Sequence, residues 1–420
     1  MHSIDRNASK LNRLGPAKRH SLTDFQMAEV DTKVELIRAL VPLGLMAACD
    51  MLEAEVEELV GAPYSRGGAY RRHGTNPGSV KLQGQRHALK VPRVRSRQGQ
   101  EVPLESWATL KESGDPDERL LRRVLYGLSC RNYAMAAEAL PGAIGMSRAT
   151  VSRTFIEASG AKLKEFRERD LSGLDIVTVF LDGKTFAEDT LVVALGVTME
   201  GRKIPLDFVQ TGTENARVLS PFLRGLAARV GDISQGILVV IDGAKGLRAA
   251  VRAAFGKDAL VQRCQWHKRE NVVAYLPKNE QPLWRRRLQQ AYERPTYSEA
   301  KKQLEQLEKE LRLVNESAAA SLREGLEETL TLHWLGVFAV LGKSFKTTNC
   351  LESINAMVAR RCDNVDHWKT SNQKHRWMAA ALLDIEPRLR RIRGYRHLPK
   401  LRLALKRELR KGTHEQSRAA

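Results

Sequence analysis

Two aspartates follow apolar segments in the same way. Asp182 lies in Phe-Leu-Asp-Gly at 180–183, and Asp242 lies in Val-Ile-Asp-Gly at 240–243. A carboxylate at the end of a buried strand is unfavourable unless a positive charge compensates it, and two such carboxylates on neighbouring strands repel each other. A divalent cation removes both problems, and magnesium prefers hard oxygen ligands. One Asp-Gly pair alone is an ordinary turn signal, so only its repetition after two strands indicates a metal site.

A third carboxylate ligand is expected from elsewhere in the chain. Glu352 lies in the segment Thr-Thr-Asn-Cys-Leu-Glu-Ser-Ile-Asn at 347–355, in the first turn of a predicted helix. An alternative role is structural, because Asn349 as N-cap with Glu352 three residues later would form a capping box. The two roles require different rotamers, so Glu352 serves one of them.

An α/β layer has to position these carboxylates. Three predicted strands, a helix, a strand, a helix and a strand give a mixed sheet. After it, residues 267–341 are almost entirely helical, and a helix at 351–361 follows. The strands are expected at 176–181, 191–198, 203–210, 236–241 and 260–264, and the helices between them at 214–230 and 245–255.

The N-terminal region combines a helical pattern with a basic segment. Apolar residues at three- and four-residue steps predict helix over 23–60, broken near Pro42 and Gly44. Between 65 and 100 every charged residue is Lys or Arg, and there is no Asp or Glu. Several glycines in the same segment predict an irregular backbone. This composition favours a track along a DNA backbone, with a solvated loop as the alternative. The candidate phosphate contacts are Arg71, Arg72, Arg93 and Arg95.

Residues 118–158 have the pattern of a helix-turn-helix. A helix at 133–140, a turn at 141–146 and a second helix from 148 are expected, and the second helix would enter the major groove. Many helical hairpins have a similar pattern, so an ordinary hairpin is the alternative. The candidate base-reading residues are Ser147, Arg148, Thr150 and Arg153.

Four segments together resemble the Mutator family of bacterial insertion-sequence transposases. They are 181–183, 241–247 (Ile-Asp-Gly-Ala-Lys-Gly-Leu), 263–268 (Arg-Cys-Gln-Trp-His-Lys) and 347–355, and the resemblance extends over about 21–400. It implies an α/β, RNase H-like catalytic core with a mixed sheet, interrupted by an all-helical insertion and preceded by a helical DNA-binding region. It also implies a DDE triad of Asp182, Asp242 and Glu352, and it aligns the family's Cys-x-x-His motif with Cys264 and His267.

The resemblance and the composition define seven regions. They are a basic tail (1–20), N-terminal helices with the basic DNA-contacting segment (21–115), a helix-turn-helix-like region (116–170), the first part of the core (171–267), the helical insertion (268–345), the final core helix with Glu352 (346–386) and a basic C-terminal tail (387–420). Within the tail, residues 388–411 hold eleven Lys or Arg and one Glu.

The chemistry expected at the triad is phosphodiester cleavage followed by strand transfer. Two Mg²⁺ ions about 4 Å apart, with Mn²⁺ as a substitute, would activate a water or a 3′-hydroxyl and stabilise the leaving oxygen. A zinc site at Cys264 and His267 is disfavoured because no second close pair of ligands follows. Cys264 is therefore expected in the core and His267 beside the active site, and Trp266, Trp284 and Trp334 are expected in the core or stacked on an unpaired base. The other active-site neighbours expected are Lys245 and Asn349.

Composition agrees with a nucleic-acid partner. The formal net charge is +20, which favours a polyanion, although a solubilising surface charge is an alternative. The resemblance to the Mutator family implies that this partner is double-stranded DNA, both the terminal inverted repeats of the element and the target, bound by a homodimer or larger homo-oligomer. Five scattered cysteines do not suggest a disulfide framework, and no apolar stretch predicts a membrane span. We therefore expect a bacterial cytoplasmic, nucleoid-associated protein.

Two other functions fit the same residues. A structure-specific nuclease with an RNase H-like fold would use the same carboxylates and magnesium without reading terminal repeats. A transposase-derived protein that only binds DNA is the second, and the intact Asp182, Asp242 and Glu352 disfavour it.

Overall fold

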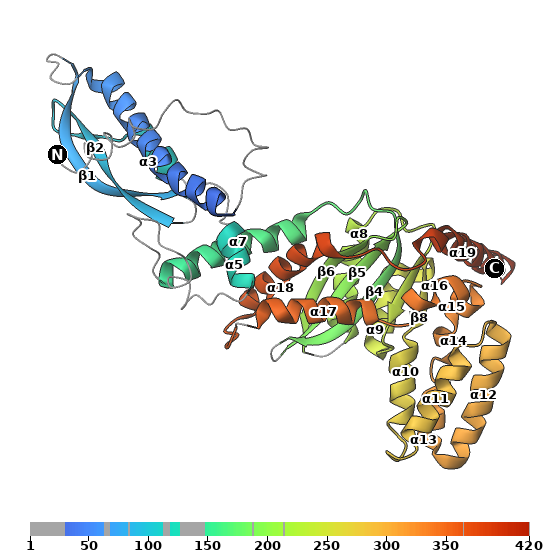
Figure 1. The fold of residues 1–420 in the computed structure, drawn as a ribbon. Helices are drawn as coiled ribbons and strands as arrows, with labels where there is room; N and C mark the ends of the chain where they lie inside the picture. The colour runs from blue at the N-terminus through green and yellow to red at the C-terminus, as the bar shows by residue number, and fades with distance from the viewer. Residues whose placement is uncertain are drawn as a thin grey trace. The chain divides into compact units, whose positions relative to one another are not determined.

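The computed structural model describes residues 30–62, 68–82, 85–111, 118–126, 148–186, 189–212, 215–363 and 365–419. The chain divides into two compact units (Figure 1). The first unit comprises Met1–Leu120 and Cys130–Thr154, and the second comprises Leu121–Ser129 and Phe155–Ala420. Helices α5 (Glu118–Leu125) and α7 (Arg148–Glu168) each begin in the first unit and continue into the second.

The first unit is a three-stranded antiparallel sheet packed against a long helix. The strand order is β1-β2-β3, and the apolar core joins Leu52 and Val56 of the helix to Val91 and Val94 of the sheet. Its elements are α3 (Val30–Val60), β1 (Tyr70–Leu82), β2 (Gln85–Ser96), β3 (Glu101–Val102) and α4 (Glu105–Lys111). The N-terminal region, expected to combine helices with an irregular basic segment, therefore also contains a sheet.

The basic segment forms a β-hairpin where an irregular backbone was expected. Val80, Leu89, Val91 and Val94 face the core, and this alternation supports paired strands more strongly than the glycines oppose them. Gly78 is needed for close packing, since an added Cβ would lie 2.9 Å from the Trp107 ring and 2.5 Å from a methyl of Val91.

Helix α3 continues through Pro42 and Gly44, so the predicted break into two helices is also wrong. A proline inside a helix removes one backbone hydrogen bond, and a long helix tolerates that loss when its other bonds remain.

The second unit is built on a mixed five-stranded sheet, as the sequence predicts. The strand order is β6-β5-β4-β7-β8. β4 pairs antiparallel with β5 and β5 with β6, whereas β4–β7 and β7–β8 are parallel. The strands are β4 (Ile176–Phe186), β5 (Asp189–Thr198), β6 (Lys203–Thr211), β7 (Ile237–Ile241) and β8 (Ala259–Arg263).

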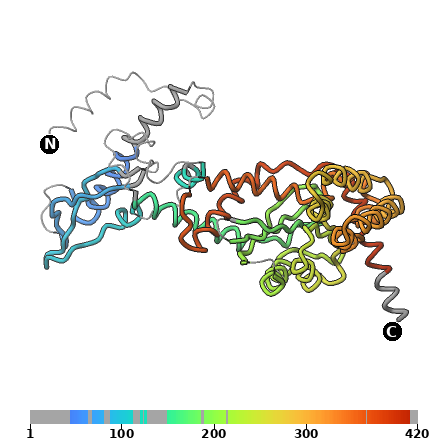
Figure 2. Tube along the Cα trace, turned by 90° about the horizontal axis from the view of Figure 1, so that it is seen from below, coloured from blue at the N-terminus to red at the C-terminus, as the bar shows by residue number. Residues whose placement is uncertain are grey.

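Helices cover both faces of this sheet. Leu219 and Leu223 of α8 (Ala216–Arg229) and Leu247 and Val251 of α9 (Lys245–Phe255) pack on the face that includes Leu181. Figure 2 shows α17 (Asn349–Cys362) and α18 (Ser371–Ile385) on the other side of the strands. Since side chains alternate along a strand, Asp182 points to the face opposite Leu181.

A helical segment separates β8 from α17 and has an apolar core of its own. Its two ends meet, because the backbone N–H of Gln265 donates to the carbonyl of Lys346 at 2.9 Å. Its helices are α10 (Gln265–Val273), α11 (Gln281–Tyr292), α12 (Tyr297–Val314), α13 (Glu316–Arg323), α14 (Leu326–Thr329), α15 (Thr331–Trp334) and α16 (Phe338–Phe345).

The C-terminal region predicted as a basic tail is folded onto the sheet. Two short 3₁₀ turns, η2 (Glu386–Arg388) and η3 (Tyr395–His397), lead into α19 (Leu398–Ala419). Leu398, Leu401 and Leu405 are fully buried, and their spacing is that of one helix face. Among the described residues, no helix is both long and apolar enough to cross a membrane.

Candidate active site

Asp182 and Asp242 come from neighbouring parallel strands at the same level. Leu181 of β4 is the register partner of Ile241 of β7, and each aspartate is the next residue along its strand. Asp182 is only 7% exposed. One carboxylate oxygen of Asp242 accepts the backbone N–H of Ala244 at 2.9 Å, which holds the turn that leads into α9.

His267 of α10 lies close enough to both aspartates to respond to their charge. Burial opposes its protonation, but a hydrogen bond with Cys264 and the negative charges around it, Asp182 and Asp242 included, raise the pKa of His267. Cys264 is fully buried and His267 half-buried. Cys264 is therefore in the core, as expected. The position of His267 beside an active site stays a prediction.

Thr348 connects this corner to the start of α17. Its hydroxyl lies 3.5 Å from Nδ1 of His267 and 3.9 Å from Sγ of Cys264, and the residue is fully buried. Thr348 is also the N-cap of α17, although its side chain makes no capping hydrogen bond. Asn349 is therefore the first helical residue, and the alternative of a capping box between Asn349 and Glu352 is wrong.

Glu352 lies on the exposed side of the first turn of α17. Its carboxylate makes no hydrogen bond or ion pair within the described part of the chain. Helix α17 contacts β4. Burial raises the pKa of Cys350, in the same turn as Glu352, to about 12, and the charge of Asp182 contributes to that rise. The helix is thus next to Asp182, with the Glu352 side chain on its outer surface.

The three carboxylates do not converge into one closed ligand set. Within the described ranges, no group of three or more His, Cys, Asp or Glu side chains is arranged to hold a metal ion. The structure brings together Asp182, Asp242 and His267, and leaves Glu352 on the neighbouring helix. The oxygen donors have the chemistry that magnesium prefers, but a shared site requires Glu352 to change its orientation.

A buried cationic network supports the Asp242 turn. The Arg263 guanidinium packs on Gly243, since a Cβ added there would lie 1.9 Å from Nε, and Gly243 has a φ of +109°. Nη1 of Arg263 donates to the carbonyl of Glu324 at 3.1 Å, and Nζ of Lys268 donates to the same carbonyl at 2.5 Å. Hydrogen bonds to the Glu324 carbonyl therefore connect the end of β8 to the helical insertion beside Asp242.

Sequence reasoning missed most of this network. Arg263 is the last residue of β8, its side chain is 7% exposed and its charge faces Glu324. Burial, and then the charge of Arg263, lower the pKa of Lys268 to about 8. Lys245 is exposed and lowers the pKa of Glu324 together with Arg263 and Lys268. No local sequence pattern indicates that Glu324 is the partner of Arg263 and Lys268. Glu324 lies about 60 residues away in the sequence, and only the hydrogen bonds of the folded chain show the pairing.

The comparison with protein families decides the identity of the chain. The family described as Transposase, Mutator family, matches residues 17–389. The chain belongs to this family. It is 29% identical over 250 residues to the transposase for insertion sequence element IS6120 of Mycolicibacterium smegmatis, which covers 56% of this chain and 74% of that protein.

Two longer matches agree with the assignment to the Mutator family. The chain is 28% identical over 355 residues to the transposase for insertion sequence element IS1081 of Mycobacterium tuberculosis, with 79% of this chain and 80% of the relative covered. It is 27% identical over 330 residues to the transposase for insertion sequence element IS905 of Lactococcus lactis, with 74% and 80% covered.

Three of the four arginines predicted to grip DNA in this Mutator-family chain already have carboxylate partners. Arg72 forms an ion pair with Glu53 of α3. Arg93 donates to both carboxylate oxygens of Glu101, and Arg95 lies 3.5 Å from the same residue. Arg71 is exposed and forms no ion pair within the described residues. DNA contact by these side chains stays a prediction.

The predicted helix-turn-helix falls largely outside the described residues. The structure does not describe the predicted first helix (133–140), the predicted turn (141–146) or Ser147. Arg148 begins α7, and its side chain is not described. Farther along α7, Thr150 is half-buried and Arg153 is exposed.

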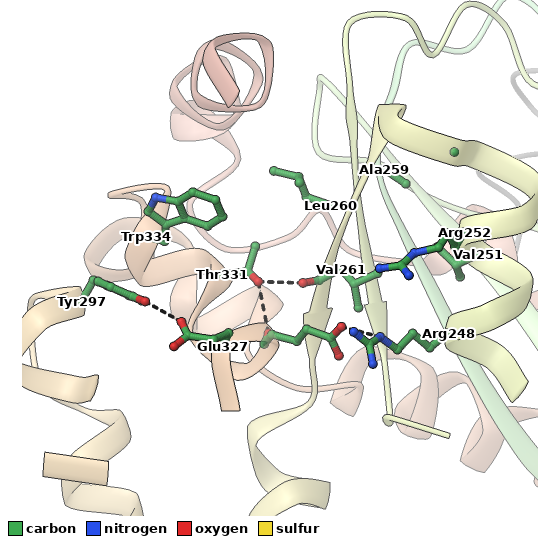
Figure 3. A pocket seen from close by; sticks show the side chains of 12 residues that line it. Arg248, Val251, Arg252, Ala259, Leu260, Val261, Tyr297, Glu327, Thr331 and Trp334 are labelled. Atoms are coloured by element: carbon green, nitrogen blue, oxygen red, sulfur yellow. Dashed lines mark hydrogen bonds and ion pairs between the residues drawn. The ribbon is translucent and has the colours of Figure 1, made fainter. Parts of the chain in front are cut away.

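The three tryptophans divide between core and surface. Trp284 is 4% exposed, whereas Trp266 and Trp334 are 42% and 53% exposed. Trp334 lines a cavity of about 390 Å³ between β8, α9 and the insertion (Figure 3). There Arg248 forms an ion pair with Glu328 at 2.5 Å, and the Tyr297 hydroxyl donates to Glu327. None of Asp182, Asp242 and Glu352 lines this cavity.

Proposed function

We propose that this chain is a DNA transposase of an insertion sequence, which binds the terminal inverted repeats of its element and catalyses strand cleavage and strand transfer. One observation carries the proposal. In a chain of the Mutator family, Asp182 and Asp242 follow register partners on neighbouring parallel strands. Aspartates so close together repel each other unless a cation lies between them, which is the electrostatic requirement of a metal-dependent nuclease.

The proposed core is RNase H-like. Support comes from the mixed five-stranded sheet, with Asp182 on its central strand β4 and Asp242 directly after the adjacent β7. The helix that carries Glu352 contacts β4, and the ends of the helical insertion meet at Gln265 and Lys346. An insertion whose ends meet leaves the sheet and α17 free to act as one catalytic layer.

Asp182, Asp242 and Glu352 would hold Mg²⁺, with Mn²⁺ as a substitute. Bound ions would help to activate a water or a 3′-hydroxyl and would stabilise the leaving oxygen. The proposal requires the exposed Glu352 side chain to turn toward β4 when DNA and metal bind. Its lack of a partner within the described residues lowers the cost of that rotation.

The remaining residues of the corner would position the aspartates and the DNA. A protonated His267 would offset part of the charge of Asp182 and Asp242. Arg263 fixes the Gly243 turn that orients Asp242. Lys245 is exposed one turn beyond Asp242, where an ammonium group would contact a phosphate of the bound strand.

The test is cleavage and joining of duplex DNA that carries the element's own terminal repeat. Asp182→Ala, Asp242→Ala and Glu352→Ala should each abolish cleavage in magnesium and leave end binding largely intact, because cationic side chains supply most of the DNA affinity. Asp258→Ala is the matched control, since Asp258 lies on the same unit outside the site and should cut normally.

Each outcome bears on a separate part of the proposal. A variant that cuts at the wild-type rate removes its residue from the triad. Wild-type protein that hydrolyses DNA without ever joining strands would be a structure-specific nuclease instead of a transposase. Wild-type protein that binds the repeat and never cuts would overturn the catalytic proposal altogether.

A further inference from the structure

The C-terminal part of the second unit carries a group of exposed basic side chains. Six exposed basic side chains there form no ion pair with any described carboxylate, and we call them the C-terminal basic surface. Some cations of the insertion, by contrast, are paired: Arg287 with Glu310, Lys301 with Glu327, and Arg312 with Glu308. The six residues of the surface are Arg390, Arg391, Arg393, Arg396, Lys400 and Arg410.

The backbone beneath this surface is held firmly. The N–H of Ile392 donates to the carbonyl of Gly201 at 3.0 Å, and the Ser344 hydroxyl donates to the carbonyl of Arg393 at 2.8 Å. Gly394, with a φ of +78°, packs so closely on Val340 that an added Cβ would lie 2.5 Å from its carbonyl oxygen. The backbone that carries these cations is therefore already ordered, and little further conformational entropy is lost when a partner binds.

The electrostatics of the neighbouring groups agree with a locally positive potential. Tyr395 lies between two of the cations, with Arg391 at 5.3 Å and Arg396 at 6.0 Å from its ring centre. Hydrogen bonding and charge from Arg396, followed by Arg391, lower the pKa of Tyr395. Glu200 is the nearby carboxylate that senses Arg391, but the two do not form an ion pair.

The surface lies at the end of the sheet away from the carboxylates. Arg402 of α19 donates to the carbonyls of Gly236 at 2.7 Å and Ile176 at 3.1 Å, which are at the amino ends of β7 and β4. Gly201, which holds Ile392, follows the end of β5, and that end is paired with Ile176. Asp182 is six residues farther along β4, or roughly 20 Å at the usual strand rise.

We propose that the C-terminal basic surface binds the phosphate backbone of duplex DNA, at a point remote from the phosphate that is cut. A span of roughly 20 Å corresponds to about six base pairs of duplex. The amino end of β4, against which the C-terminal segment packs, is thus well separated from Asp182. The identification of DNA as the partner rests on the proposed function. The position of the binding surface rests on the unpaired cations alone.

The experiment measures duplex affinity against salt concentration for the full-length protein. The test variant carries Arg390→Gln, Arg393→Gln and Lys400→Gln, and its matched control carries Lys301→Gln, Arg312→Gln and Arg323→Gln. Both variants lose three positive charges, but those of the control already have carboxylate partners. The slope of log K against log salt should fall by about 2.7 for the test variant, since each phosphate contact contributes about 0.9. The control should change it little.

An unchanged slope in the test variant, or an equal fall in both variants, overturns the proposal. The three single variants at 390, 393 and 400 replace the triple variant if it loses its cooperative unfolding transition, and each should lower the slope by about 0.9. Failure of this surface is distinguishable from failure of the proposed catalysis. Binding is measured without magnesium, so the slope is informative whether or not the wild-type protein cuts DNA.

Discussion

The hairpin of the first unit and the C-terminal segment of the second are both rich in arginine, but their charges are used differently. In the hairpin, Arg93 and Arg95 share Glu101, and Arg72 pairs with Glu53. In the C-terminal segment, six exposed cations have no such partner within the described residues. The count of basic residues in a window of sequence therefore does not give the charge that is available to a ligand.

The difference arises from residues outside each window. Residues 65–100 contain no Asp or Glu, yet α3 and β3 supply Glu53 and Glu101 to the folded hairpin. The C-terminal segment packs against the amino ends of β4 and β7, where Arg402 donates to two backbone carbonyls and forms an ion pair with Asp175. One arginine there, Arg402, is buried among those carbonyls and has a structural role, unlike Arg390 on the surface.

The largest expected effect separates this buried arginine from the exposed ones. Arg402→Met should destabilise the second unit by about 2 kcal/mol, because it leaves the carbonyls of Gly236 and Ile176 without their donor. Arg390→Gln should change the free energy of unfolding by less than about 0.5 kcal/mol. Urea unfolding of the two variants tests the contrast, and equal stabilities would show that Arg402 does not hold α19 to the sheet.

A smaller effect is expected when a partner is removed from the hairpin. If the hairpin grips DNA, Glu101→Gln releases Arg93 and Arg95 and should steepen the salt dependence of duplex binding by up to about 1.8. Glu105→Gln is the matched control, since it removes the same charge from the same unit and releases no arginine. Equal slopes for both variants would mean that these arginines do not contact phosphate.

The smallest effect concerns the protonation of the same glutamate. The hydrogen bond from Arg93, followed by the charges of Arg93 and Arg95, lowers the pKa of Glu101 to about 2 from an ordinary value of 4.5. A carboxyl group with a lowered pKa stabilises the fold above its unfolded value and loses that contribution as the pH falls. The contribution of Glu101 should thus be complete above pH 4.5 and be lost toward pH 2.

The measurement for this prediction is an NMR titration of the Glu101 carboxyl group. Its midpoint should lie well below 4.5 in the wild-type protein and should move toward 4.5 in Arg93→Ala. A wild-type midpoint near 4.5 would show that the ion pair is not formed in solution, and the hairpin would then resemble the C-terminal segment.

The sequence by itself determined the core of the second unit. Short β-branched runs predicted five strands, and the repeated Asp-Gly after two of them indicated that Asp182 and Asp242 lie together, as the register of β4 and β7 confirms. The strands could be predicted because short β-branched apolar runs favour buried strands. β4 continues to Phe186, so Asp182 lies within its strand and not at its end, and it is the parallel register that places it level with Asp242.

The tertiary structure alone decided which charges are free and where helices begin. It paired Arg93 with Glu101, fastened Arg263 and Lys268 to Glu324, and made Thr348, instead of Asn349, the N-cap of α17. It also folded the C-terminal tail into α19. The charge pairings depend on residues far apart in the chain, about which a local pattern contains no information. Sequence therefore fixes the strands and their carboxylates, and packing fixes the partners of every charge.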